Sequence, residues 1–196
     1  MNKTDKLLFE SDVCHKLAYG LKFYLKNKQV EEAVGFGILG GTHITTLAPF
    51  SSIAKSYKLK DCKPILNPII NIGSYMVYRG KKILPIYELF KIVKNSLNLK
   101  INIKSKEVMY FGNHINGLKI ISENNTYYFY YDHVRGEFTL IEWVDNKEPK
   151  QLTINNQFIL FDWLDAHMFD FRGLIDKNLA ISVNNDKLND TYKYKV

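Results

Sequence analysis

The chain has 196 residues, of which 46% are apolar and 24% are charged, values close to those of an average globular protein. This composition excludes a wholly disordered chain, and the length is sufficient for a hydrophobic core that needs no metal or disulfide. The formal net charge is +7, and residues 1–100 hold 16 Lys and Arg against 7 Asp and Glu, while residues 101–196 hold 11 against 13.

The basic first half has two explanations. A positively charged surface is typical of proteins that bind nucleic acid or an acidic partner. However, 24 of the 27 basic residues are Lys, and 18 Asn and 20 Ile accompany them. These three residue types have A·T-rich codons, so base composition alone also accounts for the charge.

The first third of the chain predicts one helix followed by strands. Thr4 or Asp5 caps a helix that continues to His15, and Gly20 ends it. One side of this helix carries Leu7, Leu8, Ser11 and Cys14/His15. Residues 21–25 and 33–39 predict a hairpin, and residues 42–47 predict a further strand. Residues 52–60 are interpreted as a short helix or a loop, and Pro64 and Pro68 keep residues 63–68 extended.

The middle of the chain predicts a second helix and a β-rich region. Residues 77–84 are a strand, a turn and a strand, and Pro85 begins an amphipathic helix that continues to residue 97. Further strands are predicted over residues 108–111, 117–122, 127–132, 137–144 and 152–154.

The last elements are a helix over residues 160–174, a strand over 179–183 and a polar tail from residue 184. Because strands follow one another rather than alternating with helices, the predicted class is α+β, with mainly antiparallel sheet and about three helices. No repeat or linker divides the chain, so we expect a single compact domain over residues 1–183 and a tail over 184–196.

A glycine-rich segment runs from Gly35 to Gly40 and matches the pattern G-x-G-x-x-G. A dinucleotide site requires this loop to open a helix, whose first amides bind the pyrophosphate. Here the segment that follows, around His43, favours a strand. We therefore predict glycines within a hairpin and expect no cofactor.

The densest aromatic run, residues 127–131, permits two interpretations. On a strand, Tyr127, Phe129 and Tyr131 share one face, and Tyr128 and Tyr130 share the other. The outer pair could stack on bases of a single strand. The favoured interpretation is a core strand, since no Lys or Arg lies within the run.

Five polar residues near the C-terminus suggest a metal or acid–base site: Asp162, Asp165, His167, Asp170 and Asp176. On a helix, Asp162 and Asp165 are neighbours, and so are His167 and Asp170, but the two pairs point apart. We therefore expect a solvated face, with no catalytic residue and no metal ligand. An enzyme built around Asp165, His167 and Asp170 stays open as a third hypothesis.

Cysteine spacing and hydropathy indicate the cellular setting. Cys14 and Cys62 have no ligand-like spacing, which predicts free thiols in a reducing cytoplasm. No segment reaches the length of apolar sequence that a spanning helix needs, and the first residues do not form a secretory signal. We expect a protein of the bacterial cytoplasm with no membrane contact; association with a virion stays an alternative.

Three blocks, which cover roughly a fifth of the chain, resemble one family. Residues 19–22 (YGLK) match its opening, residues 61–68 and 80–89 resemble its "KPILRP" and "GEKFVPI..L" blocks, and residues 169–181 resemble its "FD..GLI.KGLAI" ending. The family is a set of uncharacterised proteins of phages and prophages in Bacteroidetes-type bacteria. Asn67 and Asn178 replace its arginine and glycine. The resemblance implies a mobile-element setting and no activity.

The sequence thus leads to one favoured function and one alternative. The favoured function is a phage or prophage accessory protein that binds a phage or host protein without catalysis. The alternative is a nucleic-acid-binding protein whose phosphate contacts come from the first half of the chain: Lys55, Lys58, Lys60, Lys63, Arg79, Lys81 and Lys82.

Overall fold

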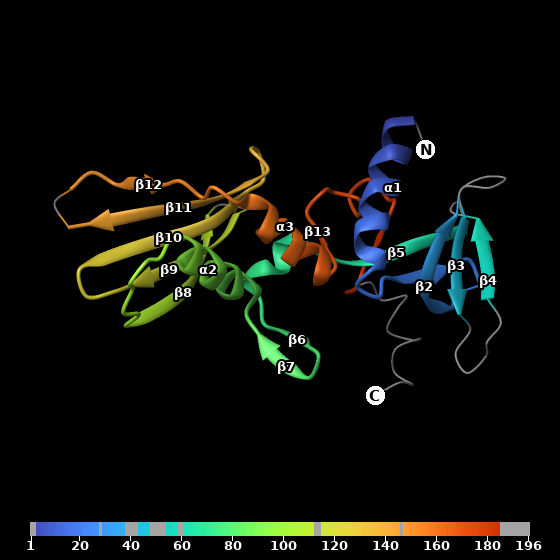
Figure 1. The fold of residues 1–196 in the computed structure, drawn as a ribbon, viewed down its shortest axis with the longest axis horizontal. Helices are drawn as coiled ribbons and strands as arrows, with labels where there is room; N and C mark the ends of the chain where they lie inside the picture. Colours follow the sequence, from blue (N-terminus) through green and yellow to red (C-terminus); the bar gives the residue numbers. More distant parts are fainter. Residues whose placement is uncertain are drawn as a thin grey trace. The chain divides into compact units, whose positions relative to one another are not determined.

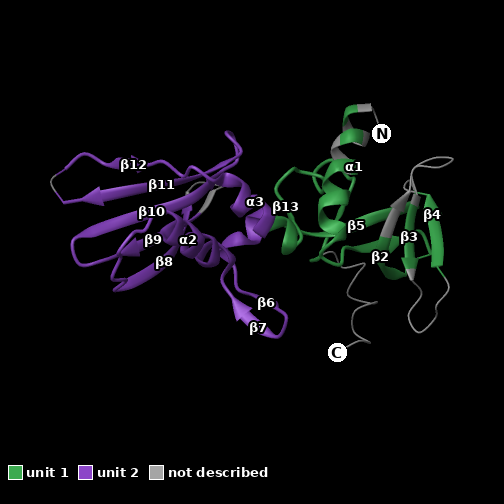
Figure 2. Ribbon diagram, in the orientation of Figure 1, with its two compact units in different colours: residues 1–68, 164–196 green, residues 69–163 purple. Residues whose placement is uncertain are grey.

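The structure is a computed structural model that describes residues 3–27, 29–37, 43–47, 54–58, 61–111, 115–145 and 147–184. Its contacts divide the chain into two compact units (Figure 2). Unit 1 comprises Met1–Pro68 and Leu164–Val196, and unit 2 comprises Ile69–Trp163. Unit 1 is therefore built from both ends of the chain, with unit 2 inserted between them.

The predicted class, α+β with mainly antiparallel sheet and three helices, is confirmed. No feature of the sequence indicated the division into two units. The single domain expected over residues 1–183 stays a prediction, since two compact units can fold together as one domain. The predicted tail lies outside the described residues from residue 185 onward.

Unit 1 contains one helix and one mixed sheet (Figure 1). Its elements are α1 (Lys3–Leu17), β1 (Lys22–Leu25), β2 (Val30–Gly37), β3 (His43–Leu47), β4 (Ala54–Lys58), β5 (Cys62–Pro68), β13 (Phe169–Asp170) and β14 (Ile181–Ser182). The sheet order is β13-β5-β1-β2-β3-β4, and β14 also pairs with β5. The two C-terminal strands run parallel to β5, while the other pairs are antiparallel.

The core of unit 1 forms where alternate strand residues meet the helix. Phe23 and Leu25 of β1, Leu66 of β5 and Val13 of α1 are all buried in one apolar cluster. Burial of a Phe or Leu side chain contributes about 1.5–3 kcal/mol each. The buried face of α1 differs from the expected one: Asp12, Val13 and Lys16 are buried, whereas Leu7, Ser11, Cys14 and His15 are exposed.

The predicted hairpin over residues 21–25 and 33–39 appears as β1 and β2, which pair from Lys22–Glu32 to Tyr24–Val30. Gly20 precedes it at φ +81°, a conformation that glycine adopts without steric cost. Gly35 and Gly37 of the G-x-G-x-x-G segment pair with β3, next to a register shift between Ala33 and Gly35. The hairpin interpretation of these two glycines is therefore confirmed, and Gly40 lies outside the described residues.

The prediction of a short helix or a loop over residues 52–60 is wrong. Residues 54–58 form β4, which pairs antiparallel with β3 from Ala54–Leu47 to Lys58–His43. Most side chains of β4 are exposed, so no apolar alternation marks it in the sequence. Hydrogen bonds to a strand edge, a tertiary feature, determine its conformation.

Unit 2 contains a 3₁₀ helix, a small hairpin, two helices and a five-stranded antiparallel sheet. Its elements are η2 (Ile69–Gly73), β6 (Met76–Tyr78), β7 (Lys81–Ile83), α2 (Pro85–Ser96), β8 (Ser105–Phe111), β9 (Ile115–Ile121), β10 (Asn125–Asp132), β11 (Glu137–Val144), β12 (Lys150–Leu152) and α3 (Gln157–Ala166), whose last residues belong to unit 1. The sheet order is β12-β11-β10-β9-β8, a simple meander.

Aromatic residues from the sheet and both helices pack together in unit 2. Phe129 of β10 is fully buried, with its ring centroid 5.4 Å from Phe138 and 6.0 Å from Phe90 of α2. Phe161 of α3 lies 6.0 Å from Phe138. The favoured interpretation of the aromatic run is therefore confirmed: Tyr127, Phe129 and Tyr131 are buried, while Tyr128 and Tyr130 are only partly buried.

The prediction of a helix over residues 160–174 is wrong beyond Ala166. The amides of His167 and Met168 bond to carbonyls three residues earlier, which tightens the last turn, and Met168 adopts φ +59°. Phe169 and Asp170 then extend to pair with β5. Gly173 therefore lies in a turn, at φ +72°, rather than at a helix end. The final strand, expected over 179–183, is limited to Ile181–Ser182.

Candidate functional site

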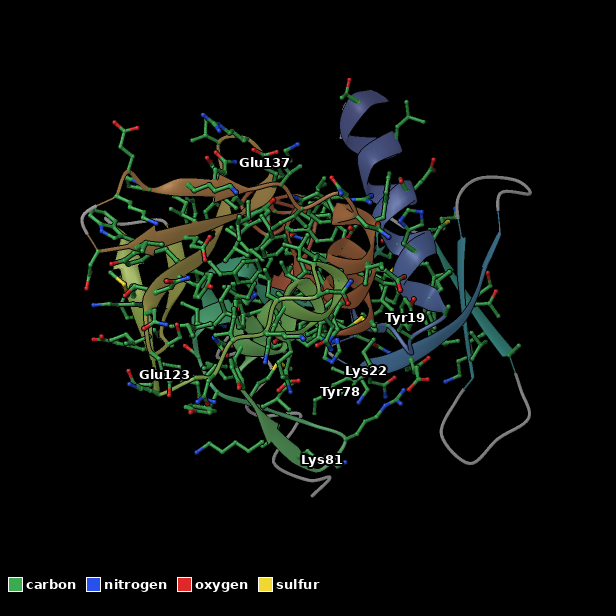
Figure 3. The ribbon with its side chains drawn as sticks, turned by 60° about the vertical axis from the view of Figure 1, so that its left-hand side comes forward. Tyr19, Lys22, Tyr78, Lys81, Glu123 and Glu137 are labelled. Atoms are coloured by element: carbon green, nitrogen blue, oxygen red, sulfur yellow. The ribbon has the colours of Figure 1, made fainter. Side chains whose placement is uncertain are left out.

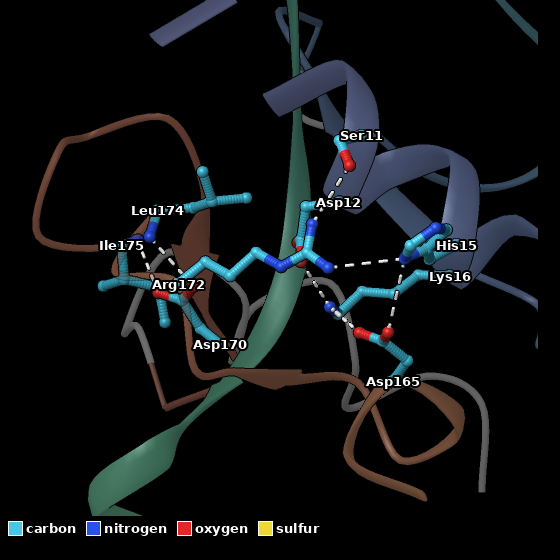
Figure 4. A network of polar contacts seen from close by, with 9 residues as sticks. All are labelled: Ser11, Asp12, His15, Lys16, Asp165, Asp170, Arg172, Leu174 and Ile175. Carbon is cyan, nitrogen blue, oxygen red and sulfur yellow. Dashed lines mark hydrogen bonds and ion pairs between the residues drawn. The ribbon is translucent and has the colours of Figure 1, made fainter. Parts of the chain in front are cut away.

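Three charged side chains meet inside unit 1 (Figure 4). Asp12 and Lys16 lie one turn apart on α1, and Asp165 comes from the end of α3. Lys16 Nζ donates to Asp12 Oδ1 at 2.7 Å and to Asp165 Oδ1 at 2.5 Å. Lys16 and Asp12 are 0% and 1% exposed, and Asp165 is 5% exposed. We call these three residues the charged cluster.

Arg172 and His15 lie at the outer side of the charged cluster. Arg172 Nε is 3.5 Å from Asp12 Oδ1, and Arg172 Nη1 donates to Ser11 Oγ at 3.2 Å. His15 Nδ1 lies 3.4 Å from Arg172 Nη2 and 3.7 Å from Asp165 Oδ2. The carboxylates of Asp12 and Asp165 thus lie beside two basic side chains, Lys16 and Arg172, which offset their negative charge.

One oxygen of the charged cluster has no hydrogen-bond partner among the residues that the structure describes. This oxygen is Asp12 Oδ2, which is buried. Burial raises the pKa of Asp12, and the nearby Asp165 adds to this, while Lys16 and Arg172 act in the opposite direction. A carboxyl group with a raised pKa holds its proton more readily, and a protonated oxygen can serve as a donor.

The expected solvated face is wrong for three of its five residues. Asp165, His167 and Asp170 are buried, whereas Asp162 and Asp176 are exposed. The error follows from the helix boundary, because residues 167–176 do not continue the helical rotation on which the prediction depended.

Asp165 and Asp170 have different roles in the structure. Asp165 pairs with Lys16, while Asp170 accepts the backbone N–H groups of Leu174 and Ile175 at 2.8 and 2.7 Å. Asp170 therefore holds the turn that leads from β13 towards β14 (Figure 4). Among the described residues, no group of three or more His, Cys, Asp or Glu side chains could hold a metal ion.

The charged cluster was not found from sequence because Lys16 and Asp165 lie 149 residues apart. One local signal existed. Asp12 and Lys16 have the i, i+4 spacing of a helical ion pair, and the apolar Val13 lies beside them. A helix face that combines an ion pair with a core residue indicates a buried pair that needs a further partner.

The seven basic residues of the nucleic-acid alternative belong to both units. Lys55, Lys58 and Lys63 are in unit 1, and Arg79, Lys81 and Lys82 are in unit 2, while Lys60 lies outside the described residues. Within unit 1, Lys55 Nζ is 3.8 Å from Glu31 Oε1, and Lys63 Nζ donates to Asn178 Oδ1 at 2.5 Å. The predicted phosphate contacts stay a prediction.

The three candidate residues that belong to unit 2 lie on the β6–β7 hairpin, residues 76–83 (Figure 3). In this hairpin Met76 pairs with Ile83, and Tyr78 pairs with Lys81. Arg79 and Gly80 occupy the turn with φ values of +48° and +75°, the positive values required by a type I′ turn. This hairpin was predicted from the sequence, and its presence is confirmed.

Three apolar side chains, one in this hairpin and two in the residues that precede it in the sequence, are unusually exposed. Ile70, Tyr75 and Val77 are 52%, 62% and 71% exposed. Lys82 Nζ lies 4.8 Å from the Tyr75 ring centroid, and the Arg79 guanidinium lies 5.3 Å from that of Tyr78. From Ile69 to Tyr87 the chain has no Asp or Glu. The hairpin therefore presents an apolar and cationic surface.

No protein-family model, no curated protein and no solved structure matches this chain. In addition, no helix among the described residues is long and apolar enough to cross a membrane.

Proposed function

We propose that this protein is a phage or prophage accessory protein that acts by binding another protein, without catalysis, and that the β6–β7 hairpin is its contact surface. The observation that carries the proposal is the exposure of Val77, on a small, separate hairpin, and of Tyr75, which directly precedes that hairpin; they are 71% and 62% exposed. Exposed aromatic and aliphatic side chains that lie close together are typical of protein contact surfaces.

The backbone of the hairpin supports the same proposal. In the part of the chain that the structure describes, β6 and β7 pair only with each other. Each strand therefore has an outer edge at which a partner strand can form hydrogen bonds. An isolated two-stranded sheet is marginally stable in water, and a partner strand would stabilise it.

Charge indicates the kind of partner. Arg79, Lys81 and Lys82 have no acidic neighbour in residues 69–87. A partner that carries carboxylates around an apolar centre would complement this surface and would associate faster at low salt. Val77 and Ile70 favour a protein over nucleic acid, because aliphatic side chains offer no stacking surface to bases.

Site-specific photo-crosslinking tests the proposal. A crosslinking amino acid replaces Val77 in cells that carry the mobile element, and the control replaces Val134, which is 96% exposed in the β10–β11 turn of the same unit. We expect one protein to be captured at position 77 and not at position 134. The captured protein is then purified and titrated against the wild type, the double variant Tyr75→Ser/Val77→Ser and the control variant Val134→Ser.

Each outcome has a distinct meaning. The double variant should bind at least about tenfold more weakly, which corresponds to about 1.4 kcal/mol, and Val134→Ser should bind as the wild type does. Capture of DNA or RNA at position 77, with affinity that falls steeply as salt rises, would instead support the nucleic-acid alternative. Equal binding by all three proteins would refute the hairpin as the contact surface.

A further inference from the structure

The charged cluster brings together the groups that form an amide bond. Lys16 Nζ, a primary amine, contacts Asp165 Oδ1 at 2.5 Å, and Asp12 Oδ1 at 2.7 Å from the same nitrogen provides a second carboxyl. The Phe171 ring centroid lies 5.1 Å from Nζ. All three charged side chains are buried, so water has little access to the reacting atoms.

We propose that Lys16 and Asp165 condense in the folded protein to an intramolecular isopeptide bond, with Asp12 as the neighbouring acid. The bond would join α1 to the last turn of α3. It is independent of the proposed binding function, because all of its residues lie in unit 1.

The reaction balances without any co-reactant. A proton passes from the Lys16 ammonium to the Asp165 carboxylate, which leaves a neutral amine and a neutral carboxylic acid. The amine lone pair attacks Asp165 Cγ, the bond from Cγ to its hydroxyl oxygen breaks, and one water molecule leaves. The ammonium and the carboxylate thereby become an amide and water, with no change in oxidation state.

Burial favours the first step. Separated charges are strongly disfavoured in a medium of low polarity, so the neutral amine and acid are closer in free energy to the ion pair than they are in water. Because Nζ and the carboxyl group are already in contact, the reaction is intramolecular, and the effective concentration of the amine at the carboxyl carbon is high.

Asp12 is suited to the role of the acid. Its Oδ2 atom is buried and accepts no hydrogen bond from the described part of the chain. Burial raises the pKa of Asp12, so the protonated form is favoured relative to a solvated Asp. Protonated Asp12 can donate to the developing oxyanion on Asp165 and move the proton that the leaving hydroxyl needs.

Arg172 and His15 mark the outer limit of the site. Arg172 Nε is 3.5 Å from Asp12 Oδ1, and His15 Nδ1 is 3.7 Å from Asp165 Oδ2. His15 is exposed, whereas Lys16 is fully buried. Water can therefore leave on the His15 side.

The consequence for the fold follows from the chain order. Unit 1 consists of residues 1–68 and 164–196, with unit 2 inserted between them. A bond from Lys16 to Asp165 would connect the two halves of unit 1 covalently and close a loop of 149 residues. Such a bond restricts the unfolded chain, as a disulfide does, and it resists reduction.

Mass spectrometry of the full-length wild-type protein, denatured after folding, is the decisive experiment. We expect an intact mass lower than that of the sequence by one water molecule. Trypsin should then fail to cleave after Lys16, and it should release residues 7–22 joined to residues 151–172 as one branched peptide. A wild-type mass equal to that of the sequence, unchanged after prolonged incubation under native conditions, would overturn the proposal.

Three variants separate this reaction from other dehydrations. Lys16→Arg keeps the cation but has no primary amine, so its mass should equal that of its sequence. Asp165→Asn should release ammonia in place of water and reach the same final mass as the condensed wild type. Asp12→Asn should remain at the mass of its sequence, or condense at least tenfold more slowly. Water loss that maps to any other peptide would also overturn the proposal.

Discussion

Removal of charge from the two carboxylates should rescue a variant that lacks Lys16. The single variant Lys16→Met leaves Asp12 and Asp165 buried, 1% and 5% exposed, without their shared cation. Breaking a buried pair in this way typically costs about 3–5 kcal/mol, because an uncompensated charge stays in the interior. The triple variant Lys16→Met/Asp12→Asn/Asp165→Asn carries no such charge and should be the more stable of the two.

The structure sets the size of this rescue. Arg172 Nε, 3.5 Å from Asp12 Oδ1, still offsets part of the charge on Asp12 after Lys16 is removed. We therefore expect the lower end of the range, about 3 kcal/mol in favour of the triple variant. For a chain of this length, that difference corresponds to a rise in melting temperature of about 6–12 °C. Neither variant has a lysine at position 16, so the comparison does not depend on an isopeptide bond.

The assay has to report on unit 1. Both tryptophans, Trp143 and Trp163, belong to unit 2, so circular dichroism and scanning calorimetry are preferred to tryptophan fluorescence. Lys91→Met is the control, because Lys91 forms a partly exposed ion pair with Glu88, and its removal should lower the free energy of unfolding by at most about 1 kcal/mol. Equal melting temperatures for the single and triple variants at neutral pH would refute the claim that the stability of the charged cluster depends on charge balance.

Three further predictions follow from burial. Cys62 is buried, with its pKa raised to about 12, and Cys14 is exposed, so a thiol reagent should modify one cysteine in the native protein and both in denaturant. Burial raises the pKa of Asp12 above 3.8, so the stability linked to this proton is complete below that pH and is lost as the pH rises through the folded pKa. Urea titrations should show the wild type losing stability relative to Asp12→Asn as the pH rises above 3.8. Phe129→Ala should lower the free energy of unfolding by about 3–5 kcal/mol, and Tyr128→Ala should lower it clearly less, because only Phe129 is fully buried. Thermal unfolding measures both values, and equal losses would contradict the assignment of Phe129 to the buried face of β10.

The sequence by itself determined the local elements with clear periodicity. The strand-favouring residues of 127–132 and 137–144 identified β10 and β11, and Pro85 marked the start of α2. The Arg79-Gly80 turn and the β6–β7 hairpin were also predicted, since a two-residue turn depends only on its own residues. In these segments, short-range sterics and the alternation of buried and exposed positions decide the conformation.

Tertiary structure alone decided the charged cluster, the end of α3 and the division into two units. Residues 167–170 leave the helical path to pair with β5, a strand about a hundred residues earlier, although the apolar pattern itself permits a longer helix. Lys16 meets Asp165 across 149 residues for the same reason. A sequence pattern indicates which face of a helix or strand is buried, but the tertiary fold of the whole chain determines which residues pack against that face. A buried charged side chain is stable only where the fold places an oppositely charged group beside it.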